Sequence, residues 1–328
     1  MKGKHIINIV SRKARYILEL ERKISVIKGN SGTGKTTLIR LVSEYLEYGK
    51  KSGIKLTVDS SASLGVLTNS SEWEKILSSV HDMVLFIDED VNYLYTEAFQ
   101  KELKIADCYA VIVSRSGMFA GLPYSVFGIY ELITERRGYS TVTSMYRLYH
   151  EEHMEGDFDL VLTEDTNSGF EMAKYAFQSD KTEVKPAGGN SSVLEKIEGI
   201  EQQFKNMCVI VDGAAFGSFI EPVLKYNEVK GNIMVSAPES FEYVVLSFNE
   251  LKRYLSSDCG ELFRTYDFCE GKEYTTWEQY YEDLLRQVTS EHLGFTYTKR
   301  KLNSWFLNTN CSKQFLDIVF RSFVRRRG

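Results

Sequence analysis

The 328-residue sequence predicts an α/β protein with two successive parallel-sheet domains and a helical C-terminal region. Three observations lead to this prediction. An apolar strand pattern runs into a glycine-rich loop and a helical pattern near residue 30, and a second alternation of strands and helices begins after residue 157. After residue 248, apolar residues recur mainly at helical spacing. Hydrophobic residues make up 43% of the chain, enough to fill two cores.

We place the boundaries of the regions where this pattern changes. The linker is polar and has one glycine between two strand-like runs, and the second domain ends where helical spacing takes over. The predicted regions are a first domain at residues 1–150, a linker at 151–157, a second domain at 158–248 and a helical C-terminal region at 249–328.

Composition and charge limit the function classes. The net charge of −5 argues against a general polyanion coat, although an acidic protein can carry a local basic groove. The five cysteines form no CxxC pair, so we expect neither a zinc site nor a disulfide framework, and a cytoplasmic location fits best. No apolar run approaches ~20 residues, so no membrane partner is expected. Short basic groups, interpreted mainly as solvated surface, are Arg12, Lys13 and Arg15, Lys299 to Lys301, and Arg325 to Arg327.

The first domain opens with three strand-like stretches, HIINIVS, ARYILELE and ISVIKG, and the last of them leads into the glycines. Gly29, Gly34, Lys35 and Thr36 complete the pattern GxxxxGK[ST], which is the P-loop motif. Apolar residues then recur at helical spacing up to Gly49. A strand, a glycine-rich loop and a helix in this order are the context that the motif requires, so we predict a compact P-loop NTPase domain.

The chemistry of such a loop follows from its backbone. Glycines let N–H groups curl around a triphosphate at a helix N-terminus, where free donors and the helix dipole favour an anion. Lys35 is predicted to neutralise the β- and γ-phosphates of ATP, and Thr36 to place its hydroxyl on Mg²⁺. The predicted nucleotide contacts are Gly29, Asn30, Ser31, Gly32, Thr33, Gly34, Lys35, Thr36 and Thr37.

The stretch MVLFIDED is predicted as a buried parallel strand whose carboxyl end brings acids to the same edge as the P-loop. We expect Asp88 to hold Mg²⁺ through water and Glu89 to be the catalytic base that orients the attacking water. An acidic turn after a core strand is the alternative, which the complete P-loop disfavours. Because no LSGGQ-like segment precedes this strand, ABC-type and repair ATPases are excluded.

The strand YAVIVSRS ends at Ser114 and Arg115, where P-loop ATPases often place a polar residue that senses the γ-phosphate. Arg115 is also suited to a surface ion pair, and Arg136 or Arg137 to stabilising charge in a neighbouring subunit. FGIYELITE and TSMYRLYH are predicted as late strands of this domain. We expect a protein partner or a homo-oligomer.

The second domain repeats the alternation of strands and helices. FDLVLTED is predicted as a strand ending in Glu164 and Asp165, SGFEMAKYAF and SSVLEKIEGIEQQF as helices, and CVIVDGAAFG as a strand ending at Asp212. The carboxyl ends of these parallel strands should bring the three acids together. Because clustered carboxylates repel one another, Mg²⁺ or Mn²⁺ is implied, with Glu164 and Asp212 as catalytic candidates. Coincidence is the alternative, since acids at loop starts are common.

The glutamate after the first of these strands, the return PAGGN and the strand ending in DGAAFG resemble a Toprim domain, the metal-binding fold of topoisomerases, primases and overcoming-lysogenization-defect (OLD) nucleases. A P-loop ATPase followed by a Toprim-like domain is similar to that nuclease family and to uncharacterised ATPases of bacterial mobile elements. The resemblance implies a metal-dependent enzyme acting on nucleic acid in antiviral defence or mobile-element biology. Two family positions differ, because Ala214 stands where a second aspartate follows Asp212, and Ser168 where an acid follows Glu164.

In the remaining sequence, APESFEYVVLSF is predicted as one more strand and NELKRYLS as the start of the helical region. Thr275 and Glu278 are expected to cap a helix with an aromatic face. These aromatic residues either belong to the core, which their helical spacing favours, or stack on single-stranded bases beside Lys299 to Lys301.

Two functions follow from these motifs. The first is an ATP-driven enzyme whose N-terminal domain controls a metal-dependent phosphodiester site in the second domain. The second is an ATP-dependent switch or scaffold whose degenerate Toprim-like domain only binds a partner or nucleotide. Glu164 and Asp212 favour the first function, whereas Ala214 and Ser168 favour the second.

Overall fold

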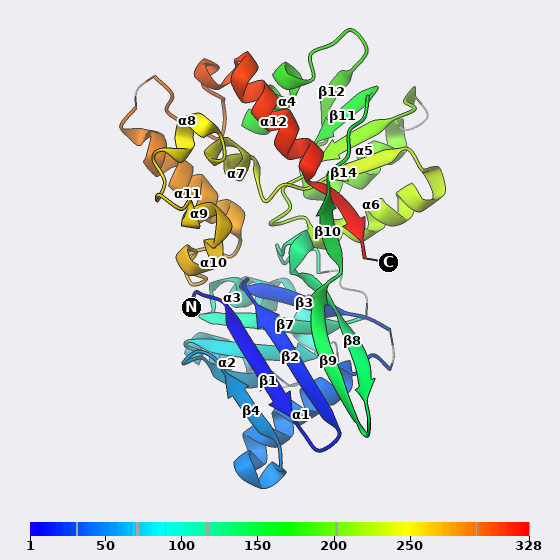
Figure 1. Ribbon diagram of the computed structural model, residues 1–328, viewed down its shortest axis with the longest axis vertical. Coiled ribbons are helices and arrows are strands. Elements are labelled where there is room, and N and C mark those ends of the chain that lie inside the picture. Colours follow the sequence, from blue (N-terminus) through cyan, green and yellow to red (C-terminus); the bar gives the residue numbers. More distant parts are fainter. Residues whose placement is uncertain are drawn as a thin grey trace. The chain divides into compact units, whose positions relative to one another are not determined.

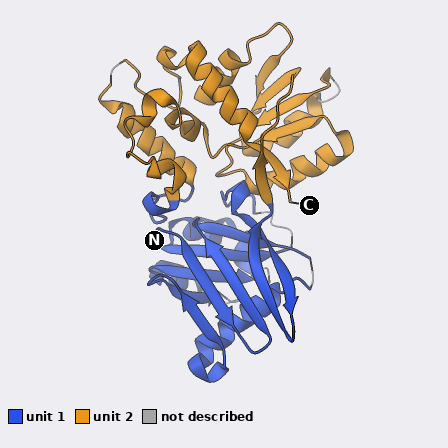
Figure 2. Cartoon of the chain, viewed as in Figure 1, with its two compact units in different colours: residues 1–148, 266–276 blue, residues 149–265, 277–328 orange. Residues whose placement is uncertain are grey.

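The computed structural model divides the chain into two compact units, shown in different colours in Figure 2. Unit 1 contains residues 1–148 and 266–276, and unit 2 contains residues 149–265 and 277–328. Both combine a mixed sheet with helices, so the predicted α/β class is confirmed. No helix in the described part of the chain is long and apolar enough to cross a membrane. The structure describes residues 1–30, 32–67, 69, 72–88, 90–115, 119–200, 203–292 and 294–327.

The described residues of unit 1 form a nine-stranded sheet with the order β4-β1-β2-β9-β8-β3-β7-β6-β5 (Figure 1). One side of this sheet is parallel and consists of the neighbouring strands β8, β3, β7, β6 and β5. At the other side, β1 pairs antiparallel with both β4 and β2. The strands are β1 His5–Val10, β2 Ala14–Leu20, β3 Ile24–Lys28, β4 Lys55–Val58, β5 Ser63–Leu67, β6 Met83–Asp88, β7 Cys108–Ser114, β8 Ile129–Arg137 and β9 Ser140–Arg147.

The pattern of apolar residues in strands β7 and β1 follows the burial of each strand. Strand β7 is buried at every position, as its continuous run CYAVIVS predicts for a central parallel strand. Strand β1 instead alternates between buried and partly exposed residues, because one face lies on the core and the other faces outward. Leu38 and Val42 of helix α1 are fully buried in the same core cluster as Ile7 and Leu18. The helices of unit 1 are α1 Lys35–Tyr48, α2 Trp73–Ser79 and α3 Glu97–Ile105.

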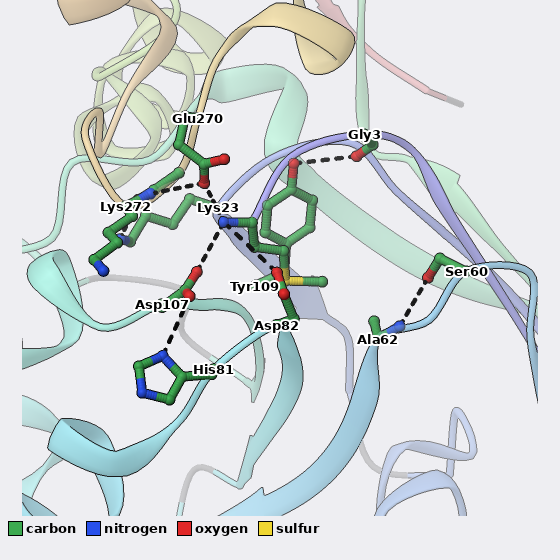
Figure 3. Close-up of polar contacts among 12 residues, drawn as sticks. Gly3, Lys23, Ser60, Ala62, His81, Asp82, Asp107, Tyr109, Glu270 and Lys272 are labelled. Atoms are coloured by element: carbon green, nitrogen blue, oxygen red, sulfur yellow. Dashed lines mark hydrogen bonds and ion pairs between the residues drawn. The ribbon is translucent and has the colours of Figure 1, made fainter.

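Residues 266–276 belong to unit 1, although they are far from it in the sequence. Lys23 is 5% exposed, and its ammonium donates a hydrogen bond to the carbonyl of Gly271. Glu270 accepts a hydrogen bond from the N-terminal ammonium of Met1, and Figure 3 shows Glu270 and Lys23 side by side. The region 249–328, which the sequence predicts as helical, is therefore divided between the two units. Residues 266–276 supply a carbonyl that the buried ammonium of Lys23 needs as a hydrogen-bond acceptor.

The described residues of unit 2 form a six-stranded sheet with the order β10-β15-β14-β13-β11-β12 (Figure 1). Strands β12, β11, β13 and β14 are parallel, and β15 and β10 extend the sheet in antiparallel pairing. The strands are β10 Tyr149–Glu152, β11 Leu160–Thr163, β12 Glu183–Pro186, β13 Met207–Ile210, β14 Ile233–Ser236 and β15 Phe323–Arg326.

The sequence prediction for this unit is wrong in one element and incomplete in others. The predicted strand APESFEYVVLSF contains helix α7, Phe241–Leu246, and the strand β14 lies before it. The Ser240 hydroxyl accepts a hydrogen bond from the N–H of Tyr243 at 3.1 Å, and this cap starts the helix despite its β-branched and aromatic residues. Strand β10 crosses the predicted boundary at residue 150 because it pairs with β15.

Helices α4, α7, α11 and α12 contribute to the core of unit 2, together with its parallel strands. Tyr281 and Leu285 of α11 are fully buried in this core, in agreement with the interpretation of the aromatic face as core. The helices are α4 Ser168–Ala176, α5 Val193–Ile200, α6 Gly217–Lys230, α7 Phe241–Leu246, α8 Asn249–Lys252, α9 Gly260–Phe263, α11 Trp277–Ser290 and α12 Thr309–Arg321. Helix α10, Thr265–Phe268, begins at the last residue before the chain returns to unit 1 and lies mainly in unit 1.

Candidate functional site

The loop between β3 and α1 contains glycines with positive φ angles. Gly32 and Gly34 have φ angles of 88° and 91°, which residues with a side chain rarely adopt. Gly34 is the N-cap residue of α1 and, as a glycine, supplies no capping side chain. The N–H groups in the first turn of a helix are donors that bind a phosphate well.

The side chain of Lys35 is folded into this loop and is 7% exposed. Its ammonium donates hydrogen bonds to the Asn30 carbonyl at 2.8 Å, to the Thr33 hydroxyl at 3.2 Å and to the Gly29 carbonyl. Three oxygens of the loop are thus among the partners of this buried ammonium. A phosphate oxygen at the same position would exchange these contacts for stronger charge-assisted hydrogen bonds.

Tyr16 of β2 supports the loop from the neighbouring part of the sheet, and no sequence motif pointed to it. Its hydroxyl donates a hydrogen bond to the Gly34 carbonyl at 2.9 Å. A Cβ atom added at Gly34 would lie 2.8 Å from that hydroxyl oxygen. Glycine is needed at this position both for its φ angle and for the close approach of Tyr16.

The strand order brings further predicted residues to the same edge. Strand β7 lies between β3 and β6, and all three are parallel. Ser114 is opposite Lys28, the residue before the loop, and Asp88 is opposite Val113. With ~4.8 Å between neighbouring strands, the backbone of Asp88 lies roughly 10 Å from the base of the loop, a distance that a phosphate and its metal can bridge. Ser114 is fully buried, whereas Arg115 is exposed.

The other nucleotide residues are placed as follows. Thr36 is exposed and Thr37 is half-buried in the first turn of α1. Glu89 and Ser31 lie outside the described residues, so their roles stay predictions.

In unit 2, the structure brings Glu164 and Asp212 together. They follow the adjacent parallel strands β11 and β13, in which Thr163 is opposite Ile210. Glu164 Oε2 accepts a hydrogen bond from the Asp212 N–H at 3.0 Å, and Asp212 Oδ1 accepts one from the Phe241 N–H at 3.0 Å. Each of these carboxyl groups therefore already binds a backbone donor.

Asp165 has a different environment from the other two acids. Its carboxylate accepts hydrogen bonds from the N–H groups of Gly169 at 3.3 Å and Phe170 at 3.0 Å. These two donors belong to the first turn of α4. The side chain that was expected to bind a metal serves as a cap for this helix.

The C-terminal segment adds charged residues around this acidic edge that the sequence did not indicate. Lys299 Nζ lies 3.1 Å from Glu278 Oε1 and 2.9 Å from Glu282 Oε2. Tyr297 donates a hydrogen bond to Glu242 at 2.7 Å. Burial alone would lower the pKa of Lys299, but Glu278 and Glu242 raise it. Lys299 is therefore a firmly charged counter-ion within this acidic group.

Burial also changes the acids themselves. It raises the pKa of Glu164 to about 8, with the charges of Glu278 and Asp165 as smaller causes. Burial raises the pKa of Asp212 well above its ordinary value, and the neighbouring carboxylates add to this effect. These raised pKa values favour the protonated acids, and protonation relieves the repulsion between the carboxyl groups.

Ala214 and Ser168, at the two positions where the resemblance to a Toprim domain implied an acid, are both buried. Ala214 is 2% exposed, and a Cβ atom at the preceding Gly213 would lie 2.4 Å from the Ala237 carbonyl. Ser168 is 1% exposed, and its hydroxyl donates to the carbonyls of Thr298 and Lys299 at 3.0 Å. A carboxylate at either position would therefore be buried, which costs free energy unless the charge is paired.

These contacts do not fit the predicted metal site of unit 2. Among the described residues, no three His, Cys, Asp or Glu side chains are grouped so that they could hold a metal ion. The cavity beside Glu164, Asp165 and Asp212 has a volume of about 30 Å³, which has room for a water molecule or an ion but not for a larger ligand.

A second, larger cavity in unit 2 has a volume of about 1100 Å³ and lies between α4, the start of β12 and residues 296–307. Leu302 and Lys301 line it from the same segment that carries Lys299, and Glu171 accepts a hydrogen bond from the Leu302 N–H at 2.6 Å. This volume is sufficient for a small-molecule ligand.

Comparison with family models, curated proteins and solved structures found no match for this chain.

Proposed function

We propose that unit 1 binds ATP with Mg²⁺ and hydrolyses it. The observation that carries this proposal is the conformation of the loop, in which the Lys35 ammonium lies among loop oxygens at the N-terminus of α1, whose N-cap residue is Gly34. A positively charged hollow lined by backbone N–H groups suits a triphosphate. The complete motif from Gly29 to Thr36 selects this ligand among other anions.

The proposed roles follow from the positions at this edge. Lys35 neutralises the β- and γ-phosphates, and the exposed Thr36 hydroxyl binds Mg²⁺ together with Asp88 through water. Ser114, at the end of the strand between the loop and Asp88, contacts the γ-phosphate. Glu89 remains the proposed base, on the basis of its place in the sequence.

For unit 2 we propose the switch or scaffold function rather than phosphodiester cleavage. Three contacts support this choice, namely the buried Ala214, the bond of Ser168 to the C-terminal segment and the cap made by Asp165. Together they remove the ligands that two metal ions would need. Hydrolysis in unit 1 would then control the binding of a partner.

Calorimetry with ATP and Mg²⁺ tests the first proposal. The parent protein should bind ATP, Lys35→Ala should lose tight binding, and Glu89→Gln should keep binding while losing turnover. Lys101→Ala, which removes an exposed lysine of α3, is the matched control and should behave like the parent. Absence of ATP binding by the folded parent protein would refute the proposal.

A nuclease assay with Mn²⁺ tests the choice made for unit 2. We expect no cleavage of single- or double-stranded substrates by the parent protein. Cleavage that disappears in Glu164→Ala but persists in Glu183→Ala, an exposed acid of β12, would instead establish a catalytic edge.

A further inference from the structure

Two turns at one end of the sheet of unit 1, β1–β2 and β8–β9, lie side by side, at the lower end of the view in Figure 1. Ala14 of β2 and Arg136 of β8 are both opposite Thr141 of β9. The Lys13 carbonyl accepts hydrogen bonds from the N–H and the hydroxyl of Thr141, at 3.0 and 3.3 Å. The strand β4 begins beside the end of β1. These pairings gather six cations, here called the basic rim, which are Arg12, Lys13, Arg15, Lys55, Arg136 and Arg137.

Most of the charge of the basic rim is not compensated. Arg137 lies 3.2 Å from Glu135, and Arg15 donates a long hydrogen bond of 3.4 Å to the Asn8 amide. Four exposed cations at one edge of a protein with a net charge of −5 create a local positive potential. The rim cations without an ion-pair partner among the described residues are Arg12, Lys13, Lys55 and Arg136.

An aromatic side chain stands among these cations. Tyr139 follows Arg137 and Gly138 at the tip of the β8–β9 turn, and its relative exposure of 105% means that no described residue covers the ring. Beside cations, it offers a surface on which an unpaired base can stack.

We infer that the basic rim is a binding surface for single-stranded nucleic acid. The rim cations contact the phosphates, and Tyr139 stacks on a base. The paired strands fix the backbone of these groups, so the loss of conformational entropy on binding falls mainly on their side chains. This inference does not depend on hydrolysis of ATP by unit 1, because no residue of the P-loop belongs to the rim.

The rim nevertheless lies close to the P-loop in the structure. Tyr16, which binds the Gly34 carbonyl, is one residue after Arg15 in β2. A competing explanation is therefore that the rim cations contact the triphosphate itself. Binding of the two ligands must be measured separately to distinguish these cases.

Fluorescence anisotropy with a labelled 20-nucleotide oligothymidylate provides the test. Binding should weaken with salt, with a slope of log K against log salt concentration of about −3 for four phosphate contacts. Lys13→Ala combined with Arg136→Ala should flatten this slope by about 1.4. Tyr139→Ala should weaken binding roughly tenfold.

Matched variants in other parts of the chain serve as controls. Lys101→Ala combined with Lys181→Ala removes two exposed lysines that do not belong to the rim, and Phe263→Ala removes an aromatic side chain that is 68% exposed. Both should leave the salt slope and the affinity unchanged. Equal effects of the rim and control variants would overturn the inference.

Three further outcomes would also overturn it. The first is no binding of the oligonucleotide at low salt. The second is a loss of ATP affinity in the rim double variant as large as its loss of oligonucleotide affinity, which would assign the rim to the nucleotide site. The third is binding to vesicles of phosphatidylserine and phosphatidylcholine in preference to the oligonucleotide.

Discussion

The contact between the Tyr16 hydroxyl and Gly34 makes the loop sensitive to a single methyl group. We expect Gly34→Ala to weaken ATP binding roughly tenfold more than Gly32→Ala. The two glycines have nearly equal φ angles, so the backbone strain is similar, but a Cβ atom at Gly32 would meet nothing within 4 Å. Calorimetry on both variants measures the difference. Equal losses of affinity would show that Tyr16 does not shape the loop.

His5 allows a test of pH dependence at the residue scale. It is 5% exposed, and burial lowers its pKa. Below about pH 6.5 the unfolded chain takes up a proton that the folded protein resists, so the free energy of unfolding falls as the pH falls, by at most ~1.4 kcal/mol per pH unit. Denaturant titrations from pH 7.5 to 5 should show a weaker dependence for His5→Gln than for the parent. The exposed His153→Gln should keep the parental profile.

The strand and the helix on either side of the glycine-rich loop could be predicted because their information is local. The motif, the preceding strand and the following helix all lie within one short stretch of sequence. Tyr16, Glu242 and Lys299 could not be predicted, because each reaches its site through the pairing of distant strands or the packing of a distant segment. The acids Glu164 and Asp212 were predicted to meet and do so, but their hydrogen bonds to backbone donors were not visible in the sequence.

At the scale of elements, α4 depends on its cap. Asp165→Ala should lower the free energy of unfolding by about 1 kcal/mol, because two N–H groups of the first turn lose their acceptor. Asp180→Ala, at an exposed aspartate outside the helices, should change stability by less than ~0.5 kcal/mol. Denaturant unfolding with and without Mn²⁺ measures both variants. A stabilisation by Mn²⁺ that only Asp165→Ala abolishes would contradict the capping role.

Most elements of the sheets could be predicted from apolar runs, and the exceptions have physical causes. The stretch FEYVVL has residues that favour strands, but the Ser240 cap and the position after β14 make it helical. Strands β10 and β15 pair with each other although they lie near opposite ends of the unit 2 sequence. Short polar strands of this kind carry little periodic signal. Their formation depends on the fold rather than on local preference.

At the scale of the molecule, Lys23 tests how residues 266–276 are attached to unit 1. Lys23→Met should lower the free energy of unfolding by about 1–3 kcal/mol, since the buried carbonyls of Ala106 and Gly271 lose their donor. The exposed Lys101→Met should change it by less than ~0.5 kcal/mol. Denaturant titration provides the comparison. A Lys23→Met protein as stable as the parent would show that other contacts hold this segment.

The return of residues 266–276 to unit 1 means that the chain crosses between the units three times, after residues 148, 265 and 276. One proteolytic nick after residue 148 would therefore leave an N-terminal fragment whose fold still includes a piece of the other fragment. The two halves should co-migrate on a native gel and separate only in denaturant. Split versions of this protein, expressed as two polypeptides, should for the same reason reassemble without any added fusion tag.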